Sequence, residues 1–145
     1  MEKNNSSIRL IDQMGRSITL NHHATRIISL VPSITELLSY LGLDDAIQGI
    51  TKFCIHPKQL HKTKTKIGGT KQVHFDRVKA LQPDLIICNK EENSKELIQE
   101  LEQLGYTLYL SDIIETEDAL SMIADIGVLT GKVESAYVLS ENIKA

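Results

Sequence analysis

Histidines are the first candidates for chemistry in this 145-residue chain, because imidazole is a common metal ligand. His22 and His23 are adjacent, so on any regular element their side chains point in different directions. His56, His61 and His74 lack the His-x-x-x-His spacing that places two imidazoles on one helix face. We therefore expect histidines of the surface or of loops, and no metal site.

Carboxylates and hydroxyls give two further candidates. Glu91 and Glu92 could act as a general acid and base. Alternatively, they favour the positive end of a helix that begins at Asn93 or Ser94. Ser33 is not part of a Gly-x-Ser-x-Gly nucleophile elbow. Since no nucleophile has a matching base, the residues predict a binding domain rather than an enzyme, with no catalytic residues.

The two cysteines, Cys54 and Cys88, fit neither a disulfide framework nor a metal knuckle at their spacing. Both fall near predicted strand ends, which leaves a disulfide as the less favoured alternative. We expect each to be a small buried or edge residue.

Composition fits one domain that buries a core, with 41% hydrophobic and 24% charged residues. The formal net charge of −3 argues against a nucleic-acid partner. The only basic run, "HKTKTK" at residues 61–66, is predicted to be a solvated loop. No signal peptide and no stretch long enough to span a bilayer are recognised, which predicts a soluble chain without direct membrane insertion.

Apolar runs of strand length alternate with helical stretches, after an expected hairpin around Met14-Gly15. This alternation, with short links, predicts an α/β fold with a mainly parallel sheet flanked by helices. Strands are expected at residues 27–31, 46–53, 84–89 and 106–112, and helices at 33–41, 74–81, 93–104, 115–131 and from 132 onward.

The stretch "ISLVPSITELL" at residues 28–38 marks one strand-to-helix junction. Pro32 ends the strand, and Ser33 and Glu36 have the spacing of a capping box. In open α/β sheets ligands bind where strand C-termini meet helix N-termini, so Ser33 is either a cap alone or part of a binding edge.

Three loops follow predicted strands and should meet on one rim: residues 54–57, 68–75 and 89–93. Gly68-Gly69 either lets the backbone approach a ligand or forms a tight turn. Neither a dinucleotide nor a Walker fingerprint surrounds this pair, so no nucleotide cofactor is expected.

Two longer segments, "RIISLVPSITELLSYLGLDDAIQGIT" and "KIGGTKQVHFDRVKALQPDLIICNKEEN", resemble the N-terminal lobe of the class III substrate-binding proteins of ABC importers. These proteins are receptors for cobalamin, haem and ferric siderophores, and the cobalamin branch is the most similar. The resemblance extends over residues 7–145 and lies in the order and spacing of motifs that are weak singly.

This resemblance implies a bilobal protein in which one long helix joins two α/β lobes around a ligand cleft. Residues 1–130 would be the N-terminal lobe and 131–145 the start of the interlobe helix, with the second lobe absent. The implied function is to bind a metal-chelate ligand of the cobalamin, haem or ferric-siderophore type, without a resident cofactor, and to dock on an ABC permease. The implied location is the periplasm. The alternative is a stand-alone cytoplasmic module that binds a ligand or partner without transport.

The resemblance also assigns site residues. Phe53 falls where cobalamin receptors place an aromatic and His56 where they often have a tyrosine, whereas Thr70 and Asn89 fall near positions that are often tryptophan. The thinner aromatic wall keeps a smaller or more polar iron chelate, or a related corrinoid, open as the ligand. Asp76 matches the acid that docks an arginine pocket of the permease. The expected ligand-binding residues are Phe53, His56, Gly69, Thr70, Lys71, Asn89 and Lys90.

Overall fold

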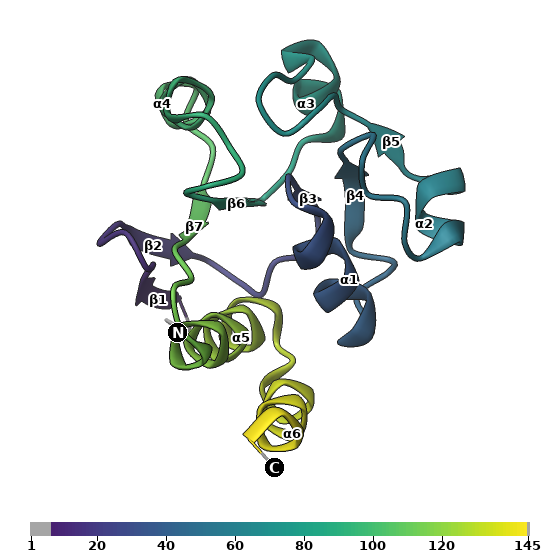
Figure 1. Ribbon diagram of the computed structural model, residues 1–145. Helices are drawn as coiled ribbons and strands as arrows, with labels where there is room; N and C mark the ends of the chain where they lie inside the picture. The colour runs from purple at the N-terminus through teal and green to yellow at the C-terminus, as the bar shows by residue number, and fades with distance from the viewer. Residues whose placement is uncertain (1–6, 145) are drawn as a thin grey trace, which may run out of the picture.

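A five-stranded parallel sheet, in the order β5-β4-β3-β6-β7, forms the centre of the computed structural model, which describes residues 7–144 (Figure 1). An antiparallel hairpin of β1 (Ile8–Ile11) and β2 (Ser17–Leu20) stands apart from it. The other strands are β3 (Ile27–Ser29), β4 (Ile47–Ile50), β5 (Thr65–Lys66), β6 (Leu85–Asn89) and β7 (Leu108–Ser111). The helices are α1 (Pro32–Tyr40), α2 (Lys58–Thr63), α3 (Phe75–Leu81), α4 (Lys95–Gln103), α5 (Thr116–Thr130) and α6 (Val133–Lys144).

Helices cover both faces of the sheet, so the predicted α/β class with a helix-flanked parallel sheet is confirmed (Figure 1). Successive side chains of a strand point to opposite faces. Ile27 therefore packs in one core with residues of α1 and α5, and Ile28 packs in a second core with α3 and α4. Burial on both faces explains why these strands read as continuous apolar runs rather than alternating ones.

The start of α1 differs from the expected capping box. Val31 is the N-cap and forms no side-chain cap hydrogen bond, while Pro32 occupies the first turn. Proline suits that position because its missing N–H would have no helical partner there. The prediction that Ser33 and Glu36 cap this helix is therefore wrong, and β3 ends at Ser29 rather than at residue 31.

The basic run at residues 61–66 is not a simple loop. It contains the end of α2 and all of β5, which pairs with β4 through Gly49 opposite Thr65. Leu60 is the buried residue that anchors α2. The Lys66 ammonium donates to the backbone carbonyl of His61, so part of this run folds back on itself.

Most of the remaining elements agree with expectation. Ser94 caps α4 by accepting from the Leu97 amide. The buried face of α4 consists of Leu97, Ile98 and Leu101. Leu104 follows the last helical residue and is 58% exposed. The capping box of the chain lies at Glu115 and Asp118, at the start of α5.

A short turn joins α5 to α6, and the two helices pack closely. A Cβ added at Gly127 would lie 2.7 Å from the Ala136 Cβ, so only glycine allows this approach. Ala136 is the buried residue of α6, whereas Val133 and Tyr137 are 58% and 64% exposed. Between residues 7 and 144, no helix combines the length and apolar character needed to cross a membrane.

Candidate functional site

The three predicted loops lie at one edge of the sheet. All five strands are parallel, so the segments that follow β4, β5 and β6 leave at the same, C-terminal edge. The N-terminus of α1 begins there as well, after β3. This edge, called the rim below, contains residues 51–57, 67–71 and 89–93 together with the turn after β7.

Asn93 ties the two halves of the rim together. Its side-chain Nδ2 donates to the backbone oxygens of Leu30 at 3.2 Å and Thr70 at 2.7 Å, and its Oδ1 accepts from the Asn89 amide at 2.8 Å. It is buried, so these bonds replace water. The sequence identified Asn93 only as a possible helix start, because partners 63 and 23 residues away leave no local pattern.

Phe53 and the glycine pair form the other half of the rim. The Phe53 ring is 52% exposed, and a Cβ at Gly69 would lie 3.4 Å from its edge. Gly68 has φ +130° and accepts from the Lys52 amide at 2.8 Å, while the Gly69 amide donates to Gln72 at 2.9 Å. The pair therefore makes a tight turn and also brings bare backbone beside the aromatic ring.

A buried cluster of hydroxyls and one thiol supports the loop that bears Phe53. Thr35 Oγ1 lies within hydrogen-bond distance of Cys54 Sγ, at 3.1 Å, and of Ser29 Oγ, at 2.8 Å. Thr51 Oγ1 lies 3.2 Å from the same sulfur and accepts from the Phe53 amide at 3.3 Å. These contacts connect the start of α1 to the loop after β4.

The cysteines are both buried and free, as expected without a disulfide. Cys54 belongs to one core and Cys88 to the other, so the sheet separates them. Burial raises the pKa of the Cys88 thiol to about 12, which keeps it protonated and unreactive.

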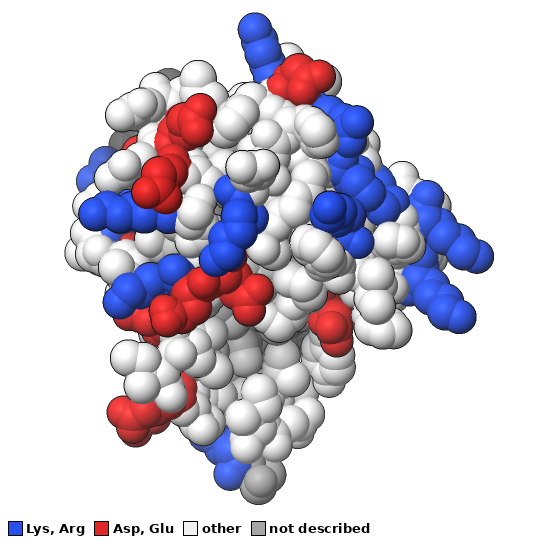
Figure 2. Space-filling view, turned by 45° about the horizontal axis from the view of Figure 1, so that its top comes forward, with Lys and Arg blue, Asp and Glu red and all other residues white. Residues whose placement is uncertain are grey.

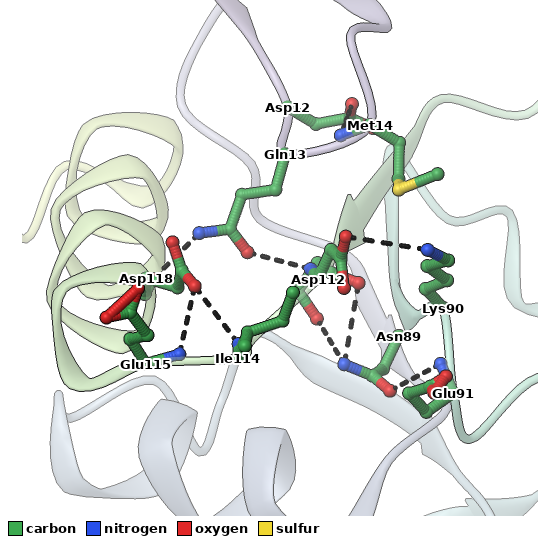
Figure 3. A network of polar contacts seen from close by, with 11 residues as sticks. Asp12, Gln13, Met14, Asn89, Lys90, Glu91, Asp112, Ile114, Glu115 and Asp118 are labelled. Atoms are coloured by element: carbon green, nitrogen blue, oxygen red, sulfur yellow. Dashed lines mark hydrogen bonds and ion pairs between the residues drawn. The ribbon is translucent and has the colours of Figure 1, made fainter.

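Asn89 and Lys90 lie on the β6 side of the rim, where a polar network joins them to the hairpin (Figure 3). Asn89 Nδ2 donates to Ser111 Oγ at 3.0 Å, and its Oδ1 accepts from the amides of Glu91 and Glu92. The Lys90 ammonium lies 3.7 Å from an Asp112 carboxylate oxygen. Asn89 thus shapes its own turn, and the two glutamates contribute backbone amides to it.

The other residues predicted to bind a ligand or a permease are exposed or half-buried and form few side-chain contacts. His56 is exposed in the loop after β4. Thr70 is half-buried and uses its carbonyl for Asn93, while the Lys71 ammonium donates to the Glu91 carbonyl at 3.3 Å and so links two loops. Asp76 is exposed in the first turn of α3, away from these contacts.

A groove of about 550 Å³ runs beside the rim, between residues 71–75 and α4. Of the predicted ligand-binding residues it contains only Lys71, and its other walls include Phe75, Ser94 and Leu97. Across the described part of the chain, no three His, Cys, Asp or Glu residues lie close enough to hold a metal ion. An exposed ring, bare backbone and lysines can bind a ligand non-covalently.

The fold is a helix-flanked parallel α/β sheet with one loop-lined rim, and comparison with known proteins gives its family. The sequence profile of the family described as "periplasmic binding protein" matches residues 27–143. The chain belongs to this family.

Individual relatives cover most of the chain. A vitamin B12-binding protein of Vibrio campbellii is 32% identical over 125 residues, which are 86% of this chain and 45% of the relative. An uncharacterised ABC transporter substrate-binding lipoprotein of Bacillus subtilis, YvrC, is 28% identical over 95% of this chain and 44% of its own length. The chain thus spans less than half the length of these curated relatives.

A solved structure shows the same fold. The petrobactin-binding protein YclQ of Bacillus subtilis superposes with a TM-score of 0.80 at 24% identity, over 96% of this chain and 50% of that one. The chain therefore has the same fold as about half of that protein.

Proposed function

We propose that the chain is part of the substrate-binding component of an ABC importer and holds a cobalamin, haem or ferric-siderophore type of ligand at its rim. The observation that carries the proposal is the rim itself, where Asn93 joins loops from both halves of the sheet in a member of the periplasmic binding protein family. The names of the relatives, for vitamin B12 and petrobactin, support this ligand class.

In this proposal residues 1–130 are one lobe, and residues 131–145 begin the helix that leads to a second lobe. The close packing of α6 on α5 supports a rigid connection. The ligand would lie between the lobes, in contact with Phe53, His56, Gly69, Thr70, Lys71, Asn89 and Lys90. The protein would act outside the cytoplasm, as the name of the lipoprotein relative suggests, and would catalyse no reaction.

A binding screen on the purified chain tests the proposal. Cyanocobalamin, dicyanohaemin and a ferric tris-catecholate would each be titrated while backbone amide NMR shifts are followed. We expect weak binding of at least one probe, because one lobe encloses only part of a ligand. The shifted amides should lie in residues 51–57, 67–71 and 89–93.

A Phe53→Ala variant makes the screen specific. Removal of the exposed ring should weaken binding about tenfold, which corresponds to about 1.4 kcal/mol. Tyr40→Ala is the matched control, since Tyr40 is also exposed but lies at the far end of α1. Equal effects of the two changes, or no binding of any probe, would contradict the proposal.

A further inference from the structure

Basic residues are segregated along this chain. Residues 51–82 contain eight lysines and arginines but only one acidic residue, Asp76, although the whole chain has a net charge of −3. The eight are Lys52, Lys58, Lys62, Lys64, Lys66, Lys71, Arg77 and Lys79. A short basic run is thus only part of a larger basic segment.

The fold gathers this segment on one side of the molecule. β5 pairs with β4 and follows α2 closely along the chain. Arg77 of α3 donates to the Lys66 carbonyl of β5 at 2.8 Å, so α2, α3 and β5 lie together. Figure 2 shows several lysine and arginine side chains with few acidic ones on the right, the side of α2, α3 and β5, whereas acidic and basic side chains are mixed on the left.

Among residues 7–144, these basic side chains form no ion pair with an acidic side chain. Within residues 7–144 the ion pairs are Arg16–Glu102, Lys90–Asp112 and Lys144–Glu141, none of which includes a residue of the basic segment. Several of the basic groups donate to backbone carbonyls instead, which leaves their charge uncompensated.

Two of the eight belong to the rim. Lys52 Nζ lies 5.2 Å from the centre of the Phe53 ring, in cation–π range. Lys71 is exposed on the loop after the glycine pair and reaches across to the Glu91 carbonyl. The exposed ring of Phe53 is therefore adjacent to the positive charge of Lys52, and the Lys71 ammonium adds a second positive charge to the rim at the loop after β6.

Positive charge beside Phe53 favours anionic ligands over ligands without net charge. Charges act over a Debye length of about 8 Å at physiological salt, so lysines on the rim affect a ligand in contact with Phe53. An oxyanion gains charge-assisted hydrogen bonds from them, whereas a chelate without net charge gains little. The lysines of α2 and α3 lie outside the rim, and screening by salt reduces their effect on a ligand held there.

We infer that the ligand is an anionic metal chelate, with carboxylate or phenolate oxygens at its periphery, rather than a neutral corrinoid. Its flat or apolar part lies on Phe53, and its oxygens pair with Lys52 and Lys71. This inference rests on the proposed function and narrows its ligand class.

Charge-removing variants test the inference with the same three probes. The double variant Lys52→Gln/Lys71→Gln should raise the dissociation constants of dicyanohaemin and the ferric tris-catecholate about tenfold or more. The matched control, Lys58→Gln/Lys62→Gln, removes the same charge from α2 and should change them less than about twofold. Added sodium chloride should weaken binding of both anions, and cyanocobalamin should bind more weakly than either.

Two results would overturn the inference while leaving the proposed function intact. One is tighter binding of cyanocobalamin than of both anions; the other is equal affinity of the rim double variant and wild type for the anions. If none of the three probes binds, the proposed function and the inference both fail.

Discussion

Asn93 is the single side chain on which the geometry of the rim depends most. Asn93→Ala would leave the Leu30 and Thr70 carbonyls and the Asn89 amide without their partner. Each unsatisfied buried group costs about 1 to 3 kcal/mol, so we expect a loss of about 3 kcal/mol in the free energy of unfolding. Urea denaturation measures this, with the exposed Asn142→Ala as control. An unchanged unfolding midpoint would show that the rim holds without Asn93.

Asp76 is the residue that we propose contacts the permease. Its carboxylate is exposed at the start of α3 and accepts no hydrogen bond from any residue between 7 and 144. In the full-length protein, Asp76→Asn should leave ligand affinity unchanged and lower transport about tenfold or more, because an arginine–carboxylate pair would be lost. Glu36→Gln removes an equally exposed acid from α1 and should transport normally. If the Asp76→Asn protein transports as well as wild type, the docking role is wrong, and Asp76 only favours the positive N-terminal end of α3.

Asp125 gives a pH-dependent prediction. Burial raises its pKa above 3.8, while a hydrogen bond from the Tyr109 hydroxyl at 2.6 Å opposes part of that shift. A raised folded-state pKa favours the protonated form, so this contribution to stability is present below the unfolded pKa and is lost as pH rises through the folded pKa. Asp125→Asn keeps an acceptor for Tyr109 and removes that loss.

We therefore expect the Asp125→Asn variant to be more stable than wild type at neutral pH, and the difference to shrink as the pH falls toward the ordinary aspartate pKa of about 4. Thermal denaturation across this range measures the difference. A difference that widens toward acid would mean that the ionised carboxylate stabilises the fold.

At the level of elements, the β1–β2 hairpin holds the outer strand of the sheet. Asp12 accepts from the Leu110 amide of β7 at 3.0 Å, which satisfies an N–H that an edge strand otherwise exposes. Gln13 accepts from the Asp112 amide at 2.9 Å and donates to the Asp118 carbonyl at 2.7 Å (Figure 3). The hairpin thereby connects the β6 side of the rim to the start of α5.

Gln13→Ala tests this connection. Loss of two hydrogen bonds should lower the free energy of unfolding by about 1 to 2 kcal/mol and raise hydrogen exchange at the Asp112 amide. Gln103→Ala, an exposed change at the end of α4, should do neither. If exchange at Asp112 is unaffected, the turn after β7 is held by other contacts.

The elements that sequence alone predicted are those with a strong local pattern. β3, β6 and β7 are apolar runs, and α4 and α5 have clear stripes or caps. α2 and β5 were missed because one buried leucine and a two-residue strand leave no periodicity. Ser33 was misassigned because Pro32 fits the first helical turn equally well.

The sequence predicted where the rim lies, but not the hydrogen bonds that join its loops. Parallel strands place their ends at one edge whatever the loops contain, so the three loops followed from the strands. The roles of Asn93, Gln13 and the Thr35–Cys54–Thr51 cluster depend on contacts between distant parts of the chain. No spacing rule within one segment indicates such contacts.

For the molecule as a whole, several apolar side chains of the α5–α6 pair are exposed. A groove of about 400 Å³ runs between the two helices and is lined by residues that include Ala124, Val128, Val133 and Tyr137. Exposed apolar surface of this kind promotes association. We expect the average mass of the 145-residue chain in light scattering to rise with concentration.

The double variant Val133→Ser/Tyr137→Ser should suppress this rise, whereas Tyr40→Ser, on an exposed aromatic of α1, should not. A mass that stays monomeric at every concentration would show that this surface is inert in the isolated chain.

The separation of basic from acidic side chains also affects how the molecule is oriented when it approaches a charged partner. Residues 51–82 contain eight basic side chains and one acidic side chain, and residues 83–118 contain ten acidic and two basic ones, so the molecule has an electric dipole between these two segments. A charged body within a Debye length exerts a torque on such a dipole before any contact forms. Anions and anionic surfaces therefore meet the side with α2 and α3 first, and Asp76 offers its carboxylate from within a positive field.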